Sequence, residues 1–141
     1  MSDHTLRARN RHALLAMLEA CGKKNFAEGL AHLTEDVYCD WPYRPIPDMP
    51  DSMTGRETLK AFFEQGQADF AGLAYEVQTI FELVDPNCLI AEYTSHSRHL
   101  PSGVPYSNQY LGIFRFEEGL ICYWREYINP MTIKEVLAAA H

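Results

Sequence analysis

Apolar residues recur at helical spacing in three segments of the first seventy residues. The first segment predicts a helix over residues 7–21. Asn25 and Glu28 have the spacing of a capping box ahead of a second, short helix. Thr54 and Glu57 form another such box ahead of a third helix that ends near residue 70. The apolar positions that define the three helices are Leu14, Leu18 and Cys21, then Phe26, Leu30 and Leu33, then Leu59, Phe62, Phe63 and Gly66.

The remainder of the chain consists mainly of β-type runs separated by turn signals. Four prolines make residues 42–54 a loop, and ordered loops of this length often carry function. Asn129 and Pro130 cap a last helix, Met131 to Ala140. The β-type runs span residues 37–41, 73–84, 87–100, 105–116 and 120–128.

The order of these elements predicts the fold class. Helices ahead of an antiparallel meander indicate an α+β fold rather than a parallel βαβ sheet. The late strands are about twice the usual length of roughly 5–6 residues. We therefore expect a bent antiparallel sheet wrapped around the N-terminal helices, as a cone with a pocket inside. We expect one domain over residues 1–141, because this length suits a single core.

Composition excludes several classes of partner. The chain is 47% apolar and 22% charged, which is ordinary for a globular protein. Its net charge of −7 argues against nucleic acid as the main partner, because phosphate binding needs a surplus of Lys and Arg. No apolar run is long enough for a membrane span, and the polar N-terminus resembles no signal peptide. We expect a cytoplasmic protein with no membrane partner.

The cysteines and histidines do not indicate a metal or a cofactor. Cys21, Cys39, Cys88 and Cys122 form no CxxC pair and lie among apolar neighbours, which is typical of free, buried thiols. A site in which Asp40, Glu92, His96 and Glu126 converge is conceivable, but no close ligand pair such as HxH supports it. We expect neither a metal ion nor a cofactor.

Glu126 is the main candidate for chemistry. Strand alternation puts it on one face with Cys122, Trp124 and Ile128. If that face is concave, a dry aromatic pocket would raise the pKa of Glu126 toward the roughly 6–7 that a general base needs at neutral pH. If the face points outward, Glu126 is a solvated carboxylate paired with a neighbouring Arg. The alternation alone leaves both interpretations open.

The partner of Glu126 across the last hairpin depends on one residue. Glu118 and Gly119 suit a type I′ turn, which pairs Glu117 with Leu120. A regular ladder from this turn sets Glu126 opposite Leu111, whereas a bulge or an extra loop residue sets it opposite Gly112. The sequence does not decide between them.

Several other residues are candidates for the same pocket. Asp40, beside Trp41, could serve as a second acid or base, or be a solvated carboxylate at a loop edge. Glu92 and His96 lie about 13 Å apart along one strand, too far to touch but able to line one elongated pocket. Asn108 and Tyr110 are polar groups in a row of apolar residues, where buried polar atoms need partners. The candidate substrate contacts are Trp41, Tyr43, Phe62, Glu92, His96, Asn108, Tyr110 and Trp124.

The chain resembles a known superfamily over nearly its whole length. The element order, with the turn Phe116 to Ile121, resembles the nuclear transport factor 2-like superfamily, which includes ketosteroid isomerase and the SnoaL-like polyketide cyclases. The closest similarity is to the phenazine-biosynthesis A/B proteins, and this resemblance implies that Glu126 is the acid or base of the pocket. The matching residues are Gly55-Arg56-Glu57, Ile80-Phe81, Asp85-Pro86, Glu92, Tyr106-x-Asn108, Phe114, Glu117-x-Gly119-x-Ile121 and Arg125-Glu126-Tyr127-x-Asn129-Pro130.

The departures from these families narrow the expected chemistry. The pocket His and Ser of the phenazine proteins align with Phe62 and Gly66, so the resemblance does not imply phenazine chemistry itself. The oxyanion Tyr and Asp of ketosteroid isomerase fall near Leu14 and Gly112, so we do not expect steroid isomerisation. The catalytic Asp of that enzyme falls within one residue of Asp40. The Arg-x-Asp pair of limonene epoxide hydrolase has no counterpart between residues 107 and 114.

Two functions remain after these exclusions. The first is a cofactor-free acid–base enzyme that isomerises, cyclises or condenses a cyclic or polyketide-like carbonyl compound. The second is a non-catalytic module of the same fold that binds a small hydrophobic or aromatic ligand or serves to dimerise. Outward apolar residues on the last strand, Ile121, Tyr123 and Tyr127, indicate a homodimer, because a strand that is apolar on both faces needs cover on both.

Overall fold

The computed structural model describes residues 1–140 as four helices and six strands. Ten elements follow one another in the predicted order, with one short strand added. They are α1 (Asp3–Gly22), α2 (Phe26–Leu30), β1 (Leu33–Asp40), β2 (Ser52–Thr54), α3 (Arg56–Gly66), β3 (Glu76–Glu82), β4 (Cys88–Arg98), β5 (Pro105–Glu117), β6 (Leu120–Ile128) and α4 (Pro130–Ala139).

The strands form one mixed sheet in the order β2-β1-β6-β5-β4-β3. The meander from β3 to β6 is antiparallel, as predicted, but β1 pairs with β6 in parallel. The expectation of a wholly antiparallel sheet is therefore corrected. Two strands far apart in the sequence lie side by side, and β1 delivers Trp41 next to the end of β6 that carries Glu126.

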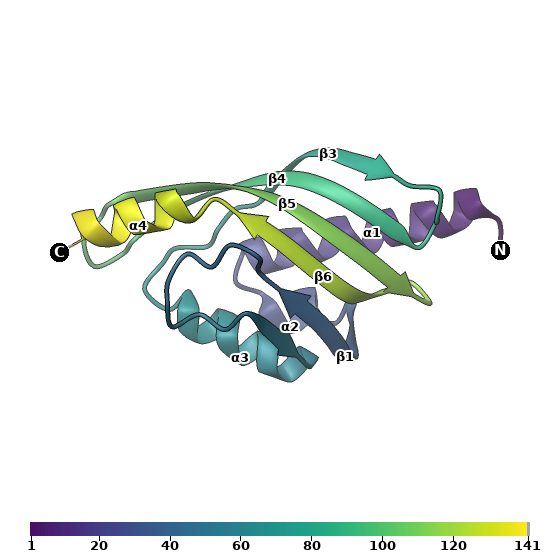
Figure 1. Cartoon of the computed structure of the whole chain (residues 1–141), viewed down its shortest axis with the longest axis horizontal. Helices are drawn as coiled ribbons and strands as arrows, with labels where there is room; N and C mark the ends of the chain where they lie inside the picture. Colours follow the sequence, from purple (N-terminus) through teal and green to yellow (C-terminus); the bar gives the residue numbers. More distant parts are fainter. Residues whose placement is uncertain (141) are drawn as a thin grey trace.

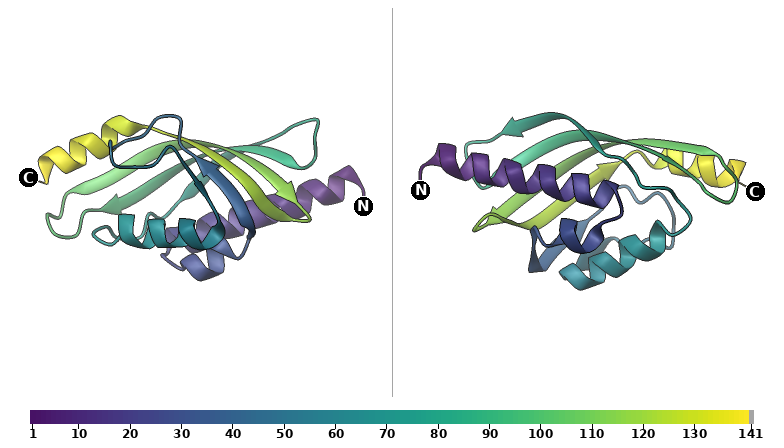
Figure 2. Two further views of the ribbon diagram at one scale, coloured as in Figure 1. Left: turned by 60° about the horizontal axis from the view of Figure 1, so that its bottom comes forward. Right: turned by 180° about the vertical axis from the view of Figure 1, so that it is seen from behind.

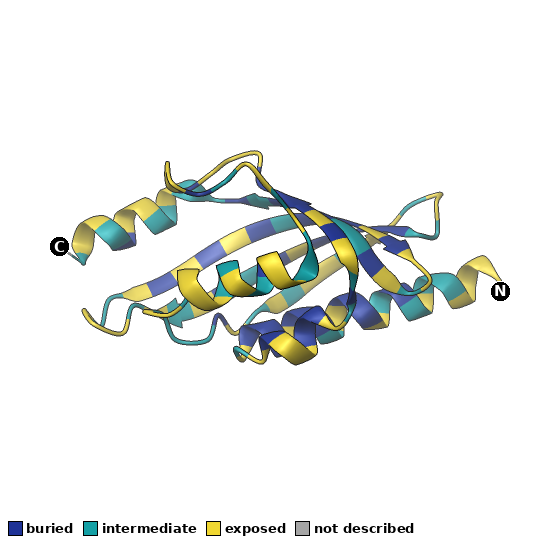
Figure 3. Ribbon diagram, turned by 90° about the horizontal axis from the view of Figure 1, so that it is seen from below, coloured by how far each residue is buried: buried dark blue, intermediate teal, exposed yellow. Residues whose placement is uncertain are grey.

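The helices and the sheet form an α+β cone. Helices α1, α2 and α3 lie on the concave side of the bent sheet, whereas α4 extends from the end of β6 (Figures 1 and 2). Buried and exposed residues alternate along the strands, as expected for a sheet with one face on the core (Figure 3). The core is where Leu14, Met17 and Leu18 of α1 meet Leu89 and Ala91 of β4, all of them buried. The predicted fold class is confirmed.

Local capping explains where the helix boundaries differ from the prediction. The α1 helix begins four residues early, at Asp3, because the Ser2 side chain accepts a hydrogen bond from the amide of Thr5. The α3 helix is preceded by Gly55 at φ 105°, a conformation that glycine adopts without steric cost. Thr54 ends the short strand β2 inside the predicted loop, so the capping box at Thr54 does not form.

The second predicted helix is also shorter than expected. The Asn25 side chain makes no capping hydrogen bond, and α2 ends at Leu30. Leu33 belongs to β1, where it is fully buried. A leucine at helical spacing and a leucine that opens a buried strand have the same local pattern, so periodicity could not separate the two.

A β-bulge decides the register of the last hairpin. Glu118 and Gly119 both have positive φ, as a type I′ turn requires, and Glu117 pairs with Leu120. Beyond Phe116 the pairing shifts by one residue, which leaves Cys122 as the extra residue and sets Glu126 opposite Gly112.

The bulge also corrects the predicted faces of β6. Ile121 lies on the concave side and is fully buried, not outward, whereas Cys122 is only partly buried. Trp124, Glu126 and Ile128 share the buried face, as the alternation predicted. Among residues 1–140, no helix is long and apolar enough to cross a membrane.

Candidate active site

The concave side of the sheet holds a mostly apolar cavity of about 250 Å³. Its wall comes from the proline-rich loop, α3 and the segment after it, the inner face of the sheet, and α4. The lining residues are Trp41, Pro45, Ile46, Met49, Phe62, Phe63, Gly66, Gln67, Phe70, Leu73, Tyr75, Tyr106, Tyr110, Glu126, Ile128, Ile133 and Leu137.

Among the described residues of this wall, Glu126 is the single charged one, and it is nearly withdrawn from solvent. It sits late in β6 on the buried face and is 8% exposed. Within residues 1–140 no Lys, Arg or His forms an ion pair with it. The first of the two interpretations left open by the sequence therefore describes its surroundings: Glu126 is buried in an aromatic pocket rather than paired in solvent.

Hydrogen bonds hold the Glu126 carboxyl from the side of the sheet. The Tyr93 hydroxyl donates to Glu126 Oε2, and the Trp124 indole donates to the Tyr93 oxygen at 3.3 Å. The Trp41 side chain lines the cavity at the same carboxyl and lowers its pKa. This chain of donors orients the carboxylate but brings no positive charge to it.

Gly112 makes room for this arrangement. It lies directly across the ladder from Glu126. A Cβ at Gly112 would come within 2.5 Å of the Phe114 ring and 3.1 Å of the Tyr93 hydroxyl. A side chain here would collide with the group that binds the carboxyl, so the bare backbone is part of the site's geometry.

Burial determines the acidity of Glu126. Desolvation raises the pKa of Glu126 to about 7, because the charged form loses its water, while the polar groups of Tyr93 and Trp41 act in the opposite direction. A carboxyl group with this pKa can both accept and return a proton near neutral pH. The same carboxylate raises the pKa of the surrounding phenols, for which burial is the larger cause.

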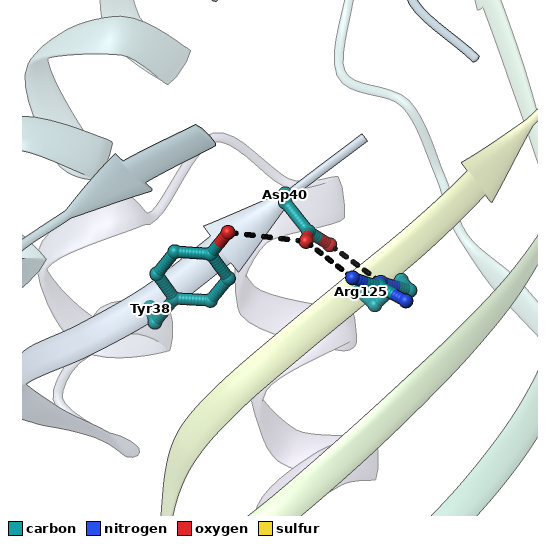
Figure 4. A network of polar contacts seen from close by, with 3 residues as sticks. All are labelled: Tyr38, Asp40 and Arg125. Carbon is teal, nitrogen blue, oxygen red and sulfur yellow. Dashed lines mark hydrogen bonds and ion pairs between the residues drawn. The ribbon is translucent and has the colours of Figure 1, made fainter. Parts of the chain in front are cut away.

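Asp40 is not a partner of Glu126. It lies on the outer face of the sheet, where Arg125 donates to it from Nε at 2.9 Å and from Nη2 at 2.8 Å (Figure 4). The Tyr38 hydroxyl donates to the same carboxylate at 3.2 Å. The expectation that Asp40 and Glu126 act as a carboxylate pair is corrected. Asp40 lies opposite Arg125 and shares its outer face, whereas Glu126, the next residue on β6, points to the inner face.

The pair on the outer face nevertheless connects the two strands beneath the site. Asp40 ends β1 directly before Trp41, and Arg125 precedes Glu126 on β6. A bidentate Arg–carboxylate pair fixes both distance and orientation. It therefore aligns β1 with β6 at the point where Trp41 reaches Glu126.

Five of the predicted substrate contacts lie in or directly behind the cavity wall. Trp41, Phe62 and Tyr110 line it. Asn108 lies behind the wall, and its amide donates to the Tyr106 hydroxyl at 2.7 Å and to the Asn129 carbonyl at 3.0 Å, so it supports Tyr106. Trp124 is buried behind Glu126 and stacks on Phe114.

The other three predicted contacts lie away from the cavity, which corrects their placement. Glu92 and His96 are exposed on the outer face of β4, because the alternate residues Leu89, Ala91, Tyr93 and Ser95 are the ones that face the core. Tyr43 is 62% exposed and packs edge-on against Tyr127 on the outer side.

Sequence reasoning missed several residues of the wall. Tyr75 and Tyr106 line the cavity, and Tyr93 lies behind it as the direct partner of Glu126. The alternation of β4 places Tyr93 and Ser95 opposite Glu92 and His96, which is the signal that could have identified Tyr93. Tyr75 precedes β3 at an irregular position, so no period marks it.

Within residues 1–140 the remaining ligand-type side chains form no metal site. Among the described residues no cluster of three His, Cys, Asp or Glu side chains suits a metal ion. All four cysteines are free, and burial raises the pKa of the thiols, which lowers their reactivity as nucleophiles.

Comparisons with known proteins agree with the resemblance predicted from the sequence. The family described as "SnoaL-like domain" matches residues 14–124. An uncharacterized PhzA/B-like protein of Pseudomonas aeruginosa is 28% identical over 98 residues, covering 70% of this chain and 68% of that protein.

Solved structures share the fold. An NTF2-like protein from Burkholderia thailandensis superposes with a TM-score of 0.74 at 9% identity, over 91% of this chain and 96% of that one. A Mycobacterium tuberculosis protein in complex with estradiol-17beta-hemisuccinate superposes with a TM-score of 0.74 at 20% identity, over 88% and 96% of the two chains. The nuclear transport factor 2-like fold predicted from the sequence is confirmed.

Proposed function

Because this chain belongs to the SnoaL-like domain family, we propose that it is a cofactor-free acid–base enzyme that moves a proton next to the carbonyl group of a neutral, largely apolar ring compound. One observation carries the proposal: Glu126 is a buried carboxyl in an apolar cavity, it has no ion-pair partner within residues 1–140, and its pKa is raised to about 7. A carboxyl group in the open or in an ion pair would be too weak a base for this work.

The proposed step uses only groups of this chain and the substrate. The Glu126 carboxylate takes a proton from the carbon next to the carbonyl, the electron pair of the C–H bond forms a carbon–carbon double bond, and the carbonyl oxygen becomes an enolate. If a second double bond is conjugated to the enolate, Glu126 then returns the proton to the far carbon while the C=O bond re-forms, which isomerises the compound. Alternatively, the enolate carbon attacks a second carbonyl carbon of the same molecule while the first C=O bond re-forms. The π electron pair of the attacked carbonyl moves to its oxygen, which takes the proton from Glu126, and the compound is cyclised. General acid–base help of this kind contributes about 10²–10⁴-fold.

The lining supports a neutral substrate. Apart from Glu126, the wall within residues 1–140 holds apolar side chains, phenols, an indole and the Gln67 amide, with no Lys, Arg or His. An anionic ligand would meet the Glu126 carboxylate without a compensating cation, which is costly at low dielectric. The steroid rings of the estradiol-17beta-hemisuccinate bound by the Mycobacterium tuberculosis neighbour support an apolar ring system as the part of a ligand that this fold accommodates.

Isotope exchange tests this proposal without the natural substrate. The probes are cyclohexanone, 2-tetralone and 2-decalone in deuterated buffer, with loss of the α-proton signals followed by NMR. We expect the wild-type protein to accelerate exchange for at least one ketone, and Glu126→Gln to lower that rate by about 100-fold or more. Glu92→Gln, the same change on the exposed outer face, is the matched control and should leave the rate unchanged.

Two results would overturn the proposed enzyme. Exchange that is no faster with wild type than with Glu126→Gln, while ketone signals still broaden on binding, would favour the alternative, a non-catalytic binding module. Failure of every probe to bind at millimolar concentration would contradict the substrate class.

We also infer that a second copy of the chain covers the outer face of the sheet. Tyr38 stacks on Tyr123 at 5.7 Å there, and Tyr43 packs on Tyr127 at 5.9 Å, so aromatic rings form a surface around the Asp40–Arg125 pair. Sedimentation should give a homodimer that Tyr123→Glu weakens and that Phe81→Glu, on the edge strand β3, does not. A wild-type monomer at micromolar concentration would contradict this inference.

A further inference from the structure

Tyr75 occupies a fixed place in the wall of the cavity. It immediately precedes β3, and its ring packs edge-on against Tyr93 and Tyr110, with ring centroids 5.6 Å away in both cases. Tyr93 and Tyr110 stack on each other at 5.0 Å. Because Tyr93 is also the residue that binds Glu126, the position of the Tyr75 ring is coupled to the position of the proposed base.

The hydroxyl of Tyr75 differs from the hydroxyls around it. Tyr93 donates to Glu126, Tyr106 accepts from the Asn108 amide at 2.7 Å, and Tyr110 is 2.8 Å from the Ser95 hydroxyl. For the Tyr75 hydroxyl, no hydrogen-bond partner is found among residues 1–140. Tyr75 is one of the residues that line the cavity, and its oxygen is not among the polar atoms that protein seals off completely.

An unpartnered phenol at this place has a specific use. A buried polar group without a partner costs free energy, and a site retains one when a ligand supplies the partner. Burial, and secondly the charge of Glu126, raises the pKa of Tyr75, so the phenol keeps its proton and acts as a donor. Glu126 can take a proton but has none to give to an oxygen at the same moment, so the site needs a separate donor for the carbonyl.

We propose that Tyr75 is a further catalytic residue of the reaction, donating a hydrogen bond to the substrate carbonyl oxygen while Glu126 removes the neighbouring proton. This inference rests on the proposed function. The phenol proton stays on Tyr75 throughout, and the negative charge moves from the carboxylate to the carbonyl oxygen, where the hydrogen bond stabilises it. Removing one such donor typically costs about 10²–10³-fold in rate.

The test uses Tyr75→Phe, which deletes the hydroxyl and keeps the ring. With 2-tetralone, or whichever ketone of the panel exchanges fastest, we expect the bound exchange rate to fall about 100-fold or more. Tyr43→Phe is the matched control, because it deletes a hydroxyl from an exposed tyrosine that does not line the cavity. Its exchange rate should stay within a few-fold of wild type.

The infrared carbonyl band of the bound ketone reports the same contact without turnover. A hydrogen bond lowers the stretching frequency, so the band should lie lower in wild type than in Tyr75→Phe. Glu126→Gln should keep the low band while losing exchange. This readout separates the two claims: a low band without exchange in wild type refutes the base and leaves the Tyr75 contact, whereas exchange and band both unchanged in Tyr75→Phe refute Tyr75 alone.

If circular dichroism shows that Tyr75→Phe does not fold, a second variant tests the same contact. Replacing Tyr75 with 3-chlorotyrosine by codon suppression keeps the ring and the hydroxyl but makes the hydroxyl a stronger donor. The band of the bound ketone should then move below its wild-type position. An unmoved band would overturn the proposal.

Discussion

At the residue scale, the account rests on the isolation of Glu126 from water and from positive charge. In the folded chain its carboxyl has a pKa of about 7, against an ordinary value of 4.5, so it keeps its proton to a higher pH than a carboxyl in water does. Between these pH values the folded state binds more protons than the unfolded state, so the contribution of Glu126 to stability falls as pH rises through this window.

The first prediction follows from this linkage. Glu126→Gln removes the titration and keeps an acceptor for the Tyr93 hydroxyl. We expect the variant to gain stability relative to wild type as pH rises from about 4.5 to 8, by on the order of 2–4 kcal/mol. Chemical denaturation across this range measures it, with Glu92→Gln to subtract the effect of the same change at an exposed position. A difference that is constant with pH would contradict the burial of the charge.

The second prediction concerns the bare backbone opposite Glu126. In Gly112→Ala the new Cβ meets the Phe114 ring and the Tyr93 hydroxyl, so both must move. We expect a loss of about 1–3 kcal/mol in the free energy of unfolding, the usual cost of overpacking, and slower ketone exchange because Tyr93 is displaced from Glu126. Gly66→Ala is the control, since a Cβ there meets nothing within 4 Å. Equal stability of the two variants would show that Gly112 has no such role.

At the scale of elements, the bulge in β6 decides which side chains reach the cavity. Ile121 and Trp124 both face inward, although they are three residues apart, because Cys122 is the extra residue between them. A regular strand would have turned one of the two outward. The bulge thus reconciles the type I′ turn with the pairing of Glu126 and Gly112.

The third prediction uses this geometry. Deletion of Cys122 removes the extra residue but keeps Ile121, Trp124 and Glu126 facing inward, so we expect a folded protein with less than about 2 kcal/mol of lost stability and ketone exchange retained. Insertion of one threonine between Trp124 and Arg125 turns Glu126 and Ile128 outward and should abolish cooperative unfolding. Calorimetry of both variants measures this. Unfolding of the deletion variant, or tolerance of the insertion, would refute the register.

At the scale of the whole molecule, local patterns predicted elements well and spatial relations less well. The strand Leu120–Ile128 and the helix after Asn129 were predicted within a residue, because turn and cap residues mark their ends. The parallel pairing of β1 with β6 was not predicted, because the sequence of a strand does not indicate which distant strand it pairs with.

The candidate site shows the same division. Strand alternation correctly grouped Trp124, Glu126 and Ile128, because an apolar face is a local property. It could not separate Asp40 from Glu126, whose faces depend on how two strands pair across the sheet. Tyr75 was invisible to periodicity, because it acquires its neighbours Tyr93 and Tyr110 only when the sheet folds over the helices.

The titration of Glu126 tests the central claim most directly. Protein labelled with carbon-13 in its glutamate side-chain carboxyls can be followed by NMR between about pH 4 and 9, and the Glu126 signal is assigned by its absence in Glu126→Gln. Because this carboxyl is buried and has no ion-pair partner within residues 1–140, we expect its titration midpoint near pH 7. A midpoint near the ordinary value of 4.5 would mean that water or a cation reaches Glu126, and would contradict its role as the base.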